Sequence, residues 1–272
     1  SGVGIWDAEL EATIATGGGR SMTGFLDVDA PATHARIAAD PSDPFRAQIP
    51  RFDHLLTYGG GPPVVAAYRG WGARACTPIY NGLDPDEHRP LEGVAVEYDL
   101  LFMGNRLPDR EARVEEFFFR AATLCPEHRF LLGGEGWGWK TDMPANVTSL
   151  GHVPTGRHNQ VNASARLVLN IHRDSMVQNG WSPATRMFEA AGAASCQVTD
   201  AWEGIEDFFA PGEEILVVAS AEEVAQLVRS VDDDRARRIG QAGRARALAD
   251  HTYTQRARQM DAILRAAPVE AA

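Results

Sequence analysis

The alternation of apolar and polar positions along the chain is the main guide to its elements. From residue 96 onward, short apolar runs alternate with stretches in which apolar residues recur at helical spacing. That rhythm is typical of strand–helix–strand units with parallel strands. It predicts strands over Tyr98–Met103, Arg129–Leu132, Asn146–Leu150, Arg166–Ile171, Ser195–Thr199 and Glu214–Val218, and a helix over Pro183–Ala193. Residues 96–272 are therefore predicted to form a complete doubly wound α/β domain.

The first 95 residues show the same rhythm with fewer parts. Strands are predicted over Thr23–Val28, His54–Tyr58 and Ala73–Ile79. A dinucleotide-type domain usually needs about five or six strands, so we expect this α/β domain to be incomplete and to lack an N-terminal piece. A stretch rich in Gly, Pro and Asp begins at residue 81, which predicts a linker over 81–95 and hence domains over 1–95 and 96–272.

Composition narrows the class of protein. The chain of 272 residues is 44% hydrophobic, and it contains no apolar run long enough to span a bilayer and no signal-peptide pattern at its start. Its three cysteines lie far apart, which disfavours a disulfide framework or a structural zinc site and predicts a cytoplasmic protein. The net charge of −11 argues against nucleic acid as a partner.

The basic residues are almost all of one kind. Lys140 is the single lysine among 26 basic residues, and the rest are arginine. If the protein binds a phosphate group, planar guanidinium groups must therefore supply most of the contacts.

The segment SPATRMFEAAGAASC carries the strongest candidate site. Pro183 is expected to start a helix, and Arg186 and Glu189 are three residues apart, so they share one helix face near the N-terminus. The unpaired amides and positive dipole of a helix start attract a diphosphate, to which Arg186 and Thr185 could add contacts. The alternative is an ordinary surface Arg–Glu pair on an amphipathic helix.

A second candidate follows the first strand of the larger domain. Gly104 lets a ligand approach the backbone at a strand end, with Asn105 beside it, and Arg106 could neutralise charge on a diphosphate leaving group. Arg110 is the other candidate cation here, and its alternative role is a surface pair with Glu111 or Glu115.

Other polar positions fall at neighbouring strand ends. The turn GGEGWGW, 133–139, matches no known phosphate loop, but Trp137 could form a wall beside a base. His172 closes a predicted strand at the same edge and is a candidate donor contact, with a satisfied polar strand end as the alternative. His152 and His158 are spaced too loosely to indicate zinc.

In the first half, Asp27 and Asp29 invite a metal site. We exclude it because Asp29 comes where a strand gives way to a helix, and we expect no metal and no cofactor. Asp29 or His34 could instead act as the base that deprotonates an acceptor hydroxyl. Capping of the following helix by Asp29 is the alternative.

These motifs together resemble a known family. The stretches DLLFMGNRLPDREARVEEFF, GHVPTGRHNQVN, LNIHRDS, SPATRMFEAAGAASCQVTD and PGEEILV resemble the CgeB-like branch of glycosyltransferases, related to the group 1, family 4-like set. The resemblance implies a GT-B architecture, in which two Rossmann-like domains face each other across a cleft. It also implies that the C-terminal domain binds a nucleotide-sugar donor and the N-terminal domain an acceptor, with Glu189 on the ribose hydroxyls.

One residue departs from the family pattern. The family 4 signature has a glutamate eight positions before the ribose-binding one, and here that position is Trp181. The segment therefore offers no carboxylate to the donor sugar there, which leaves the stereochemistry of transfer open. Trp181 could stack on a sugar or a base, or it could simply pack.

The expected function is transfer of a sugar, as a hexosyltransferase, from a nucleotide diphosphate donor to a hydroxyl-bearing acceptor without a metal ion. A nucleotide-sugar-binding partner or regulatory protein without activity is the main alternative, favoured by Trp181 and by the small first domain. A nucleotide-sugar epimerase is a third possibility, although no carboxylate and histidine set for it is identifiable.

Overall fold

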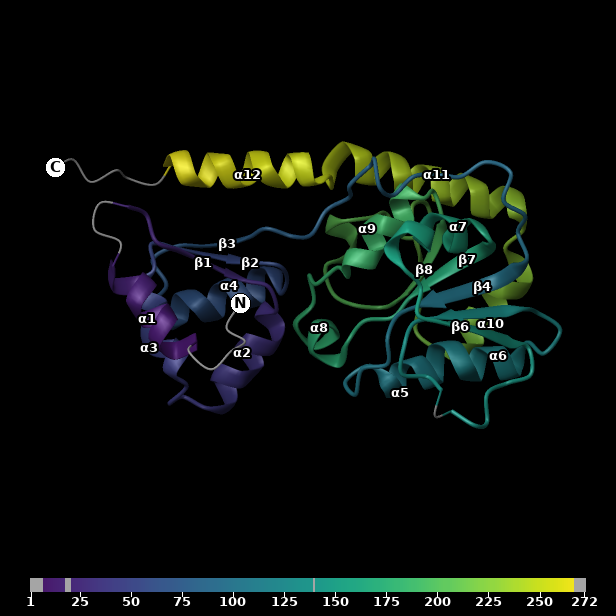
Figure 1. Ribbon diagram of the computed structural model, residues 1–272, viewed down its shortest axis with the longest axis horizontal. Coiled ribbons are helices and arrows are strands. Elements are labelled where there is room, and N and C mark those ends of the chain that lie inside the picture. The colour runs from purple at the N-terminus through teal and green to yellow at the C-terminus, as the bar shows by residue number, and fades with distance from the viewer. Residues whose placement is uncertain (1–6, 18–20, 139, 267–272) are drawn as a thin grey trace. The chain divides into compact units, whose positions relative to one another are not determined.

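The computed structural model describes residues 7–17, 21–138 and 140–266 (Figure 1). The chain divides into two compact units. Unit 1 comprises Ser1–Asn81, Ser175–Pro183 and Thr254–Ala272, and unit 2 comprises Gly82–Asp174 and Ala184–Tyr253. The chain therefore passes from one unit to the other four times.

Unit 1 contains a parallel three-stranded sheet whose strands lie in chain order. The strands are β1 (Gly24–Asp27), β2 (His54–Thr57) and β3 (Cys76–Pro78), all within the predicted segments. Helices α1 (Asp7–Gly17), α2 (Ala30–Ala39), α3 (Pro44–Gln48) and α4 (Gly61–Gly70) and a short 3₁₀ turn (Ile49–Arg51) surround it, and α12 (Tyr253–Ala266) returns to this unit. Its core is built around Phe45, Phe52 and Tyr68.

Unit 2 contains a parallel six-stranded sheet in the order β6-β5-β4-β7-β8-β9. Its strands are β4 (Tyr98–Met103), β5 (Phe130–Gly133), β6 (Val147–Gly151), β7 (Ala165–Asn170), β8 (Cys196–Asp200) and β9 (Leu216–Val218), which confirms all six predicted strands. Strand order reverses between β4 and β7. In sheets of this kind, ligands bind beyond the carboxyl ends of the strands at that reversal.

Both faces of this sheet are buried, as a doubly wound sheet requires. Leu100 and Phe102 of β4 pack with the helical segment 111–124 and with α10 (Ala221–Ser230), whereas Leu101 and Met103 pack toward α7 (His158–Ala163) and α9 (Thr185–Gly192). Segment 111–124 comprises α5 (Glu111–Val114), a π-helical turn (Glu115–Arg120) and α6 (Ala121–Leu124), and α11 (Asp233–Asp250) packs against β8 and α9. Helices thus cover both faces of the sheet (Figure 1). Successive strand residues pack on opposite helical layers.

Helix α9 begins later than expected. The helix predicted to start at Pro183 starts at Thr185, because Ala184 still has extended backbone angles, with φ −66° and ψ 143°. Two further short helical segments in this region are α8 (Asp174–Asn179) and a 3₁₀ turn (Thr155–Arg157). The 3₁₀ turn at Ile205–Asp207 follows β8.

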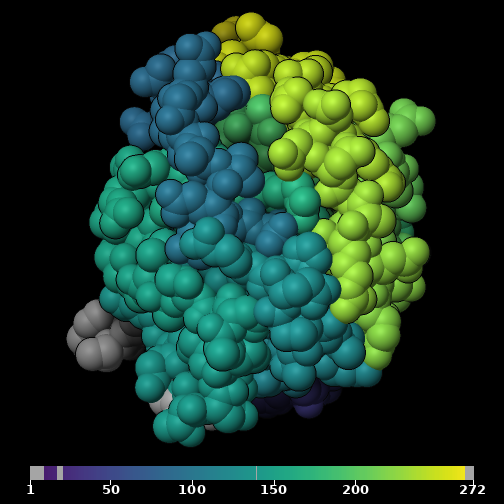
Figure 2. Space-filling model, turned by 90° about the vertical axis from the view of Figure 1, so that its right-hand side faces the viewer, coloured from purple at the N-terminus to yellow at the C-terminus, as the bar shows by residue number. Residues whose placement is uncertain are grey.

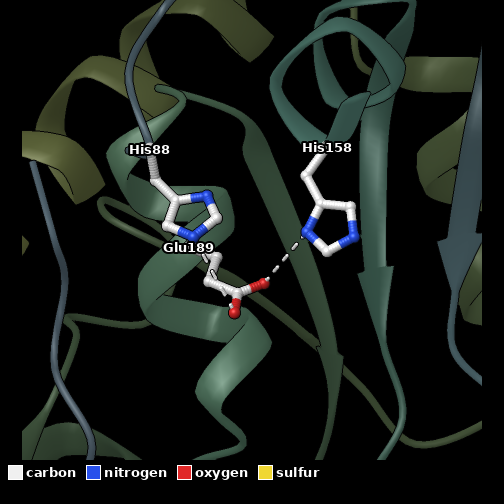
Figure 3. A group of neighbouring side chains, drawn as sticks. All are labelled: His88, His158 and Glu189. Atoms are coloured by element: carbon white, nitrogen blue, oxygen red, sulfur yellow. Dashed lines mark ion pairs between the residues drawn. The ribbon is translucent and has the colours of Figure 1, made fainter. Parts of the chain in front are cut away.

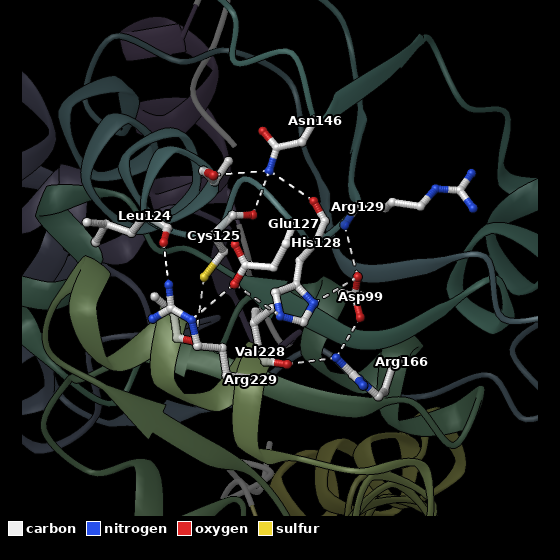
Figure 4. A network of polar contacts seen from close by, with 12 residues as sticks. Asp99, Leu124, Cys125, Glu127, His128, Arg129, Asn146, Arg166, Val228 and Arg229 are labelled. Carbon is white, nitrogen blue, oxygen red and sulfur yellow. Dashed lines mark hydrogen bonds and ion pairs between the residues drawn. The ribbon is translucent and has the colours of Figure 1, made fainter.

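A network of polar contacts lies at the end of the unit 2 sheet where its strands begin (Figure 4). The side-chain amide of Asn146 donates to the backbone carbonyls of Ala122, Cys125 and His128 at 2.9–3.0 Å. The Asp99 carboxylate accepts from Arg166 at 2.6 Å, and Arg166 also donates to the carbonyl of Val228. These bonds tie β4, β5 and β7 to the ends of α6 and α10, so this edge serves the fold.

No helix among the described residues has both the length and the apolar character that a membrane span requires. Cys76, Cys125 and Cys196 are all buried and unbridged. Burial raises the pKa of Cys76 and of Cys196 to about 12, so both remain protonated thiols at neutral pH.

Candidate functional site

The candidate site of unit 2 lies beyond the carboxyl ends of β4 and β7, where the strand order reverses. Gly104 follows β4, His172 follows β7, and α9 starts nearby with Thr185 as its first residue. Because the two strands are hydrogen-bonded neighbours, segments distant in the sequence meet at this edge. The structure thus brings together the donor-site candidates expected on unit 2.

Glu189 lies at the centre of a compact polar group. The ion pair between Arg186 Nη1 and Glu189 Oε2 is 2.9 Å long. Two imidazoles flank the carboxylate (Figure 3): His158 Nδ1 is 3.7 Å from Oε2, and His88 Nε2 is 3.9 Å from Oε1. The rings of His88 and His158 stack with their centroids 6.2 Å apart. The pair is therefore half-buried and in contact with two imidazoles, unlike an isolated pair on the surface.

The neighbours of His158 determine which ring nitrogen carries its proton. His158 Nε2 lies 3.2 Å from the carbonyl of Val153, which can only accept, so Nε2 donates. Its Nδ1 lies 2.8 Å from Nη1 of Arg186, which can only donate, so Nδ1 accepts. His158 thereby helps to hold Arg186 beside Glu189.

The carboxyl group of Glu189 is ionised at neutral pH. Burial raises its pKa, but the contacts with His158 and the charges of Arg186 and His88 outweigh burial and lower the pKa below the usual 4.5. An ionised carboxylate that already contacts an arginine still has lone pairs on its oxygens. It can therefore accept hydrogen bonds from two adjacent hydroxyl groups.

The same group contains a possible metal-ligand set. One ligand atom each of His88, His158 and Glu189 lies within 4.8 Å of the others. However, Nη1 of Arg186 lies 2.9 Å from Glu189 Oε2 and 2.8 Å from His158 Nδ1, so a positive group already contacts two of the three ligand atoms. A metal ion here would have to displace that guanidinium, which makes the set a poor fit for a cation.

The ion pair with Glu111 that the sequence offered as an alternative for Arg110 is made by another arginine. The exposed pair with Glu111 is made by Arg106, at 2.6 Å. Arg110 instead lies against Gly104, donates to the carbonyl of Asn105 and has its guanidinium 5.5 Å from the centre of the Phe102 ring.

The charge environment of Arg110 favours an anion. Burial lowers its pKa, Asp109 opposes that change, and the positive charges of Arg173 and Arg186 lower the pKa further. Repulsion among three guanidinium groups is relieved when an anion binds between them. Arg173 and Arg186 are each already paired with a carboxylate, Asp109 at 2.6 Å and Glu189 at 2.9 Å, whereas Arg110 makes no ion pair among the described residues. Arg110 is therefore the arginine of this site best suited to a phosphate.

The glycine-rich turn after β5 packs on the strand-end loop of β4. A Cβ on Gly134 would lie 2.3 Å from the carbonyl oxygen of Gly104, and the φ of Gly134 is +121°. Asn105 Oδ1 accepts from the amide of Glu135, and Trp137 Nε1 donates to the Gly104 carbonyl. The suggestion that Trp137 forms a wall beside a base is wrong, because its side chain is 2% exposed in the core.

His172 is buried, with both ring nitrogens engaged. Its Nδ1 lies 2.7 Å from Asp200 Oδ1, and its Nε2 accepts from the amide of Ala184 at 3.3 Å. Asp200 is fully buried and also bonds Arg113 at 2.6 Å. Burial raises the pKa of Asp200, but His172 and Arg113 outweigh it and keep the pKa below 3.8. In this arrangement His172 reaches α9 rather than a ligand.

The acceptor-side candidates lie in unit 1. Asp29 immediately precedes α2, and its carbonyl accepts from the amides of Ala32 and Thr33 while its side chain makes no capping hydrogen bond. The capping alternative for the Asp29 side chain is therefore wrong. His34 Nδ1 donates to Asn179 Oδ1 at 3.0 Å, which fixes the proton on Nδ1.

Trp181 also belongs to unit 1, in the returning segment 175–183. Its φ of +39° lies in the left-handed region that non-glycine residues avoid. Its carbonyl accepts from the amide of Gly60, which also bonds the hydroxyl of Ser182. A Cβ on Gly61 would lie 2.4 Å from the Trp181 Cβ, so this turn is shaped by the close approach of Trp181.

A cavity of about 780 Å³ lies elsewhere in unit 2, at the amino-terminal ends of β7 and β8. It is bounded by segment 90–96 and α11, which appear in blue and yellow-green in Figure 2. Asn162 contributes to its wall, and the side-chain amide of Asn162 is buried without a hydrogen-bond partner. Because this cavity lies at the ends where the strands begin, it is distinct from the polar site at the ends where they finish.

Comparison with known proteins identifies the family. A model of the family described as glycosyl transferase-like matches residues 110–262, which is more than half of the chain. The chain belongs to this family. Comparison with curated protein sequences gives no significant match.

Solved structures of other glycosyltransferases share the fold. Sucrose-phosphate synthase from Thermosynechococcus elongatus matches with a TM-score of 0.69 and 16% identity, over 90% of this chain and 67% of that one. Anabaena HepE in complex with UDP-glucose matches with a TM-score of 0.71 and 14% identity, over 95% and 76%. The trehalose-6-phosphate synthase OtsA matches with a TM-score of 0.67 and 12% identity, over 95% and 70%. This glycosyl transferase-like chain therefore has the GT-B fold expected from its sequence.

Three residues in or beside the candidate site of this glycosyl transferase-like protein were not predicted from the sequence. His88 lies in the segment interpreted as a linker, and Arg113 and Asp200 lie on elements that looked purely structural. A signal for His88 exists in the small residues of α9, because a Cβ on Gly192 would lie 2.6 Å from the carbonyl oxygen of His88. The run of small residues thus lets this segment approach the helix that carries Glu189.

Proposed function

We propose that this chain is a hexosyltransferase of the CgeB-like branch, which transfers a sugar from a nucleotide diphosphate to a hydroxyl group without a metal ion. The observation that carries the proposal is the ionised Glu189 paired with Arg186 on α9, together with Arg110 at the adjacent strand end. HepE, which shares the fold, binds UDP-glucose, and this supports a nucleotide-sugar donor.

In the proposed complex, Glu189 accepts the ribose hydroxyls, while Arg110, Arg186 and the first amides of α9 hold the diphosphate. Their positive charge stabilises the leaving nucleotide diphosphate as the bond to the sugar breaks, with Gly104 allowing close backbone approach. The guanidinium of Arg186 at the His88, His158 and Glu189 group supports metal independence.

An acceptor base is proposed on unit 1. His34 donates through Nδ1 to Asn179, so Nε2 is the basic nitrogen that could take a proton from the acceptor hydroxyl. Asp29 is the second candidate. The proposed setting is the cytoplasm, in keeping with three buried, unbridged thiols.

A binding protein without transferase activity is the second candidate function. Trp181 favours it, because this residue replaces the earlier glutamate of the signature and its backbone is anchored to Gly60. An assay for released nucleotide and transferred sugar separates the two functions: binding of a donor with no turnover would support the second.

The test is nucleotide binding. UDP-, GDP- and dTDP-glucose are titrated into the wild type, and we expect at least one to bind and to raise its melting temperature. Glu189→Ala removes two hydrogen bonds to a charged acceptor, so the affinity should fall about 10- to 100-fold. Glu206→Ala, at an exposed carboxylate of the same unit, should bind as the wild type does. An unchanged affinity in Glu189→Ala contradicts the proposed role.

A further inference from the structure

The start of α9 lacks a cap of its own. Ala184 occupies the N-cap position, where Ser, Thr, Asp or Asn usually supplies a side-chain oxygen, and alanine can supply none. The helix nevertheless carries Arg186 and Glu189, whose placement the proposed function requires to within a fraction of an ångström. Something outside the helix must therefore hold its first turn.

The structure supplies that support from three other segments. The backbone amide of Ala184 donates a hydrogen bond to Nε2 of His172 at 3.3 Å. His172 Nδ1 lies 2.7 Å from Asp200 at the end of β8, and Arg113 of α5 donates to the other Asp200 oxygen from Nε at 3.0 Å and from Nη2 at 2.6 Å. Every member of this chain of bonds belongs to unit 2.

The charge of Asp200 determines which atom donates and which accepts in each of these hydrogen bonds. His172 and Arg113 lower the pKa of the buried Asp200, and an ionised carboxylate can only accept, so Nδ1 of His172 must be the protonated nitrogen. Nε2 then carries the lone pair that accepts from Ala184. The backbone amide of His172 also donates to Asp200, at 3.2 Å, and the Trp202 ring lies 5.1 Å from the imidazole. The hydrogen bonds with Asp200 and Ala184 thus set the tautomer, and these bonds and the contact with Trp202 set the orientation of the ring.

This chain of bonds also links two helix starts. Arg110 is the N-cap residue of α5, the helix that carries Arg113, and Ala184 is the N-cap residue of α9, the helix that carries Arg186. Through Asp200 and His172, the two helices are held at a fixed separation. The two arginines proposed to bind the diphosphate therefore keep a defined spacing.

We infer that His172 is a positioning residue, which together with Asp200 and Arg113 holds the first turn of α9 in its nucleotide-binding position without touching the nucleotide. The inference rests on the proposed function, because it explains how Arg186 and Glu189 are aligned for the donor. It also predicts which of the two nitrogens of His172 matters most for binding.

Two amide substitutions separate the two nitrogens. In His172→Asn, the side-chain amide can still donate to Asp200 from near the Nδ1 position but does not reach Ala184. In His172→Gln, the carbonyl oxygen can accept from Ala184 near the Nε2 position. We expect His172→Gln to bind UDP, GDP or dTDP, whichever the wild type binds most tightly, within about threefold of the wild type, and His172→Asn to bind about 10- to 100-fold more weakly.

A stability control distinguishes positioning from general support. Asn146→Ala removes three hydrogen bonds at the opposite edge of the same sheet, so its melting temperature should fall while its nucleotide affinity stays unchanged (Figure 4). Titration calorimetry and thermal melting are measured on all four proteins, well below the lowest melting temperature.

The outcomes separate the two proposals. Equal affinities for His172→Asn and the wild type, or affinities that simply follow melting temperature across all four proteins, would overturn the positioning role while leaving the proposed function intact. A wild type that binds none of the three nucleotides would overturn the proposed function and, with it, this inference. Weak binding by His172→Asn, with rescue by His172→Gln, supports both.

Discussion

Arg110 and Arg106 stand four residues apart, yet their surroundings differ. Arg106 pairs with Glu111 and its side chain is 39% exposed, so its charge is already balanced and partly screened by water. Arg110 is half-buried against Gly104 and Phe102, and two further arginines add positive charge to its surroundings. A half-buried cation without a carboxylate partner gains more from an incoming phosphate than an exposed, paired one.

The two arginines should therefore respond differently to substitution. Arg110→Ala removes a charge-assisted contact to the diphosphate, which predicts a 10- to 100-fold loss of UDP affinity by calorimetry, on the basis of about 1.5–3 kcal/mol. Arg106→Ala should change that affinity by less than about threefold. Uridine, which lacks phosphate, serves as the control ligand and should bind equally to both variants. Equal losses of UDP affinity in the two variants would contradict the assignment of Arg110.

At the scale of elements, the start of α4 illustrates how a turn can be shaped by a distant segment. Gly60 and Gly61 have φ values of +84° and +42°, and Trp181 contacts this turn from the returning segment 175–183. Side chains are disfavoured at such angles, and here the space is also filled. Gly61 is thus required by a contact with a residue 120 positions away in the sequence, whereas a Cβ on Gly60 would meet Val64 of the same helix.

The two ends of α4 offer a matched comparison. Gly61→Ala would place a Cβ 2.4 Å from that of Trp181 at a positive φ, so we expect a loss of about 2 kcal/mol in the free energy of unfolding. Gly70→Ala, in the last turn of the same helix, meets open space and should be neutral or stabilising by up to about 1 kcal/mol. Urea denaturation measures both. A Gly61→Ala protein as stable as Gly70→Ala would show that the turn adapts.

At the scale of the whole molecule, buried carboxyl groups make stability depend on pH in opposite directions. Burial dominates for Asp27, whose pKa is raised above 3.8 despite hydrogen bonds from Tyr68 and Thr33. Asp27 therefore contributes fully to the free energy of unfolding at pH values below its pKa in the unfolded chain. This contribution is lost as the pH rises through its pKa in the folded protein. For Asp200 and Glu189 the pKa is lowered, so their contribution is present at neutral pH and is lost as the pH falls.

Comparison of one pair of variants isolates the effect of Asp27. Asp27→Asn keeps an acceptor for the Asp29 amide and cannot ionise, so its stability relative to the wild type should rise as the pH increases from about 3.8 toward neutrality. Asp53→Asn should show the opposite trend at lower pH, because hydrogen bonds from Thr23 and the charge of Arg74 lower the pKa of Asp53, so the contribution of its carboxylate is lost only as the pH falls below about 4. Chemical denaturation across both pH ranges measures the two differences. A flat difference for Asp27→Asn would contradict the raised pKa.

Much of this architecture is encoded locally. Apolar runs of strand length between amphipathic stretches specify buried parallel strands, and all nine predicted strands are present. The spacing of Arg186 and Glu189 predicts that they share one face of a helix, and both lie on α9 within 2.9 Å of each other. These features depend on periods of two and 3.6 residues, which are visible in any short window of sequence.

Other features depend on which segments meet in three dimensions, and no local pattern specifies that. The strand order brings His172 and Asp200 together, the passage of segment 82–97 past α9 brings His88 to Glu189, and the return of 175–183 puts Trp181 on the glycine turn. Burial and charge at these meeting points decide whether Arg110 or Arg106 is left without a carboxylate partner. Local hydrophobic periodicity therefore determined the elements of this protein, whereas long-range packing decided which polar groups face one another and hence where its chemistry lies.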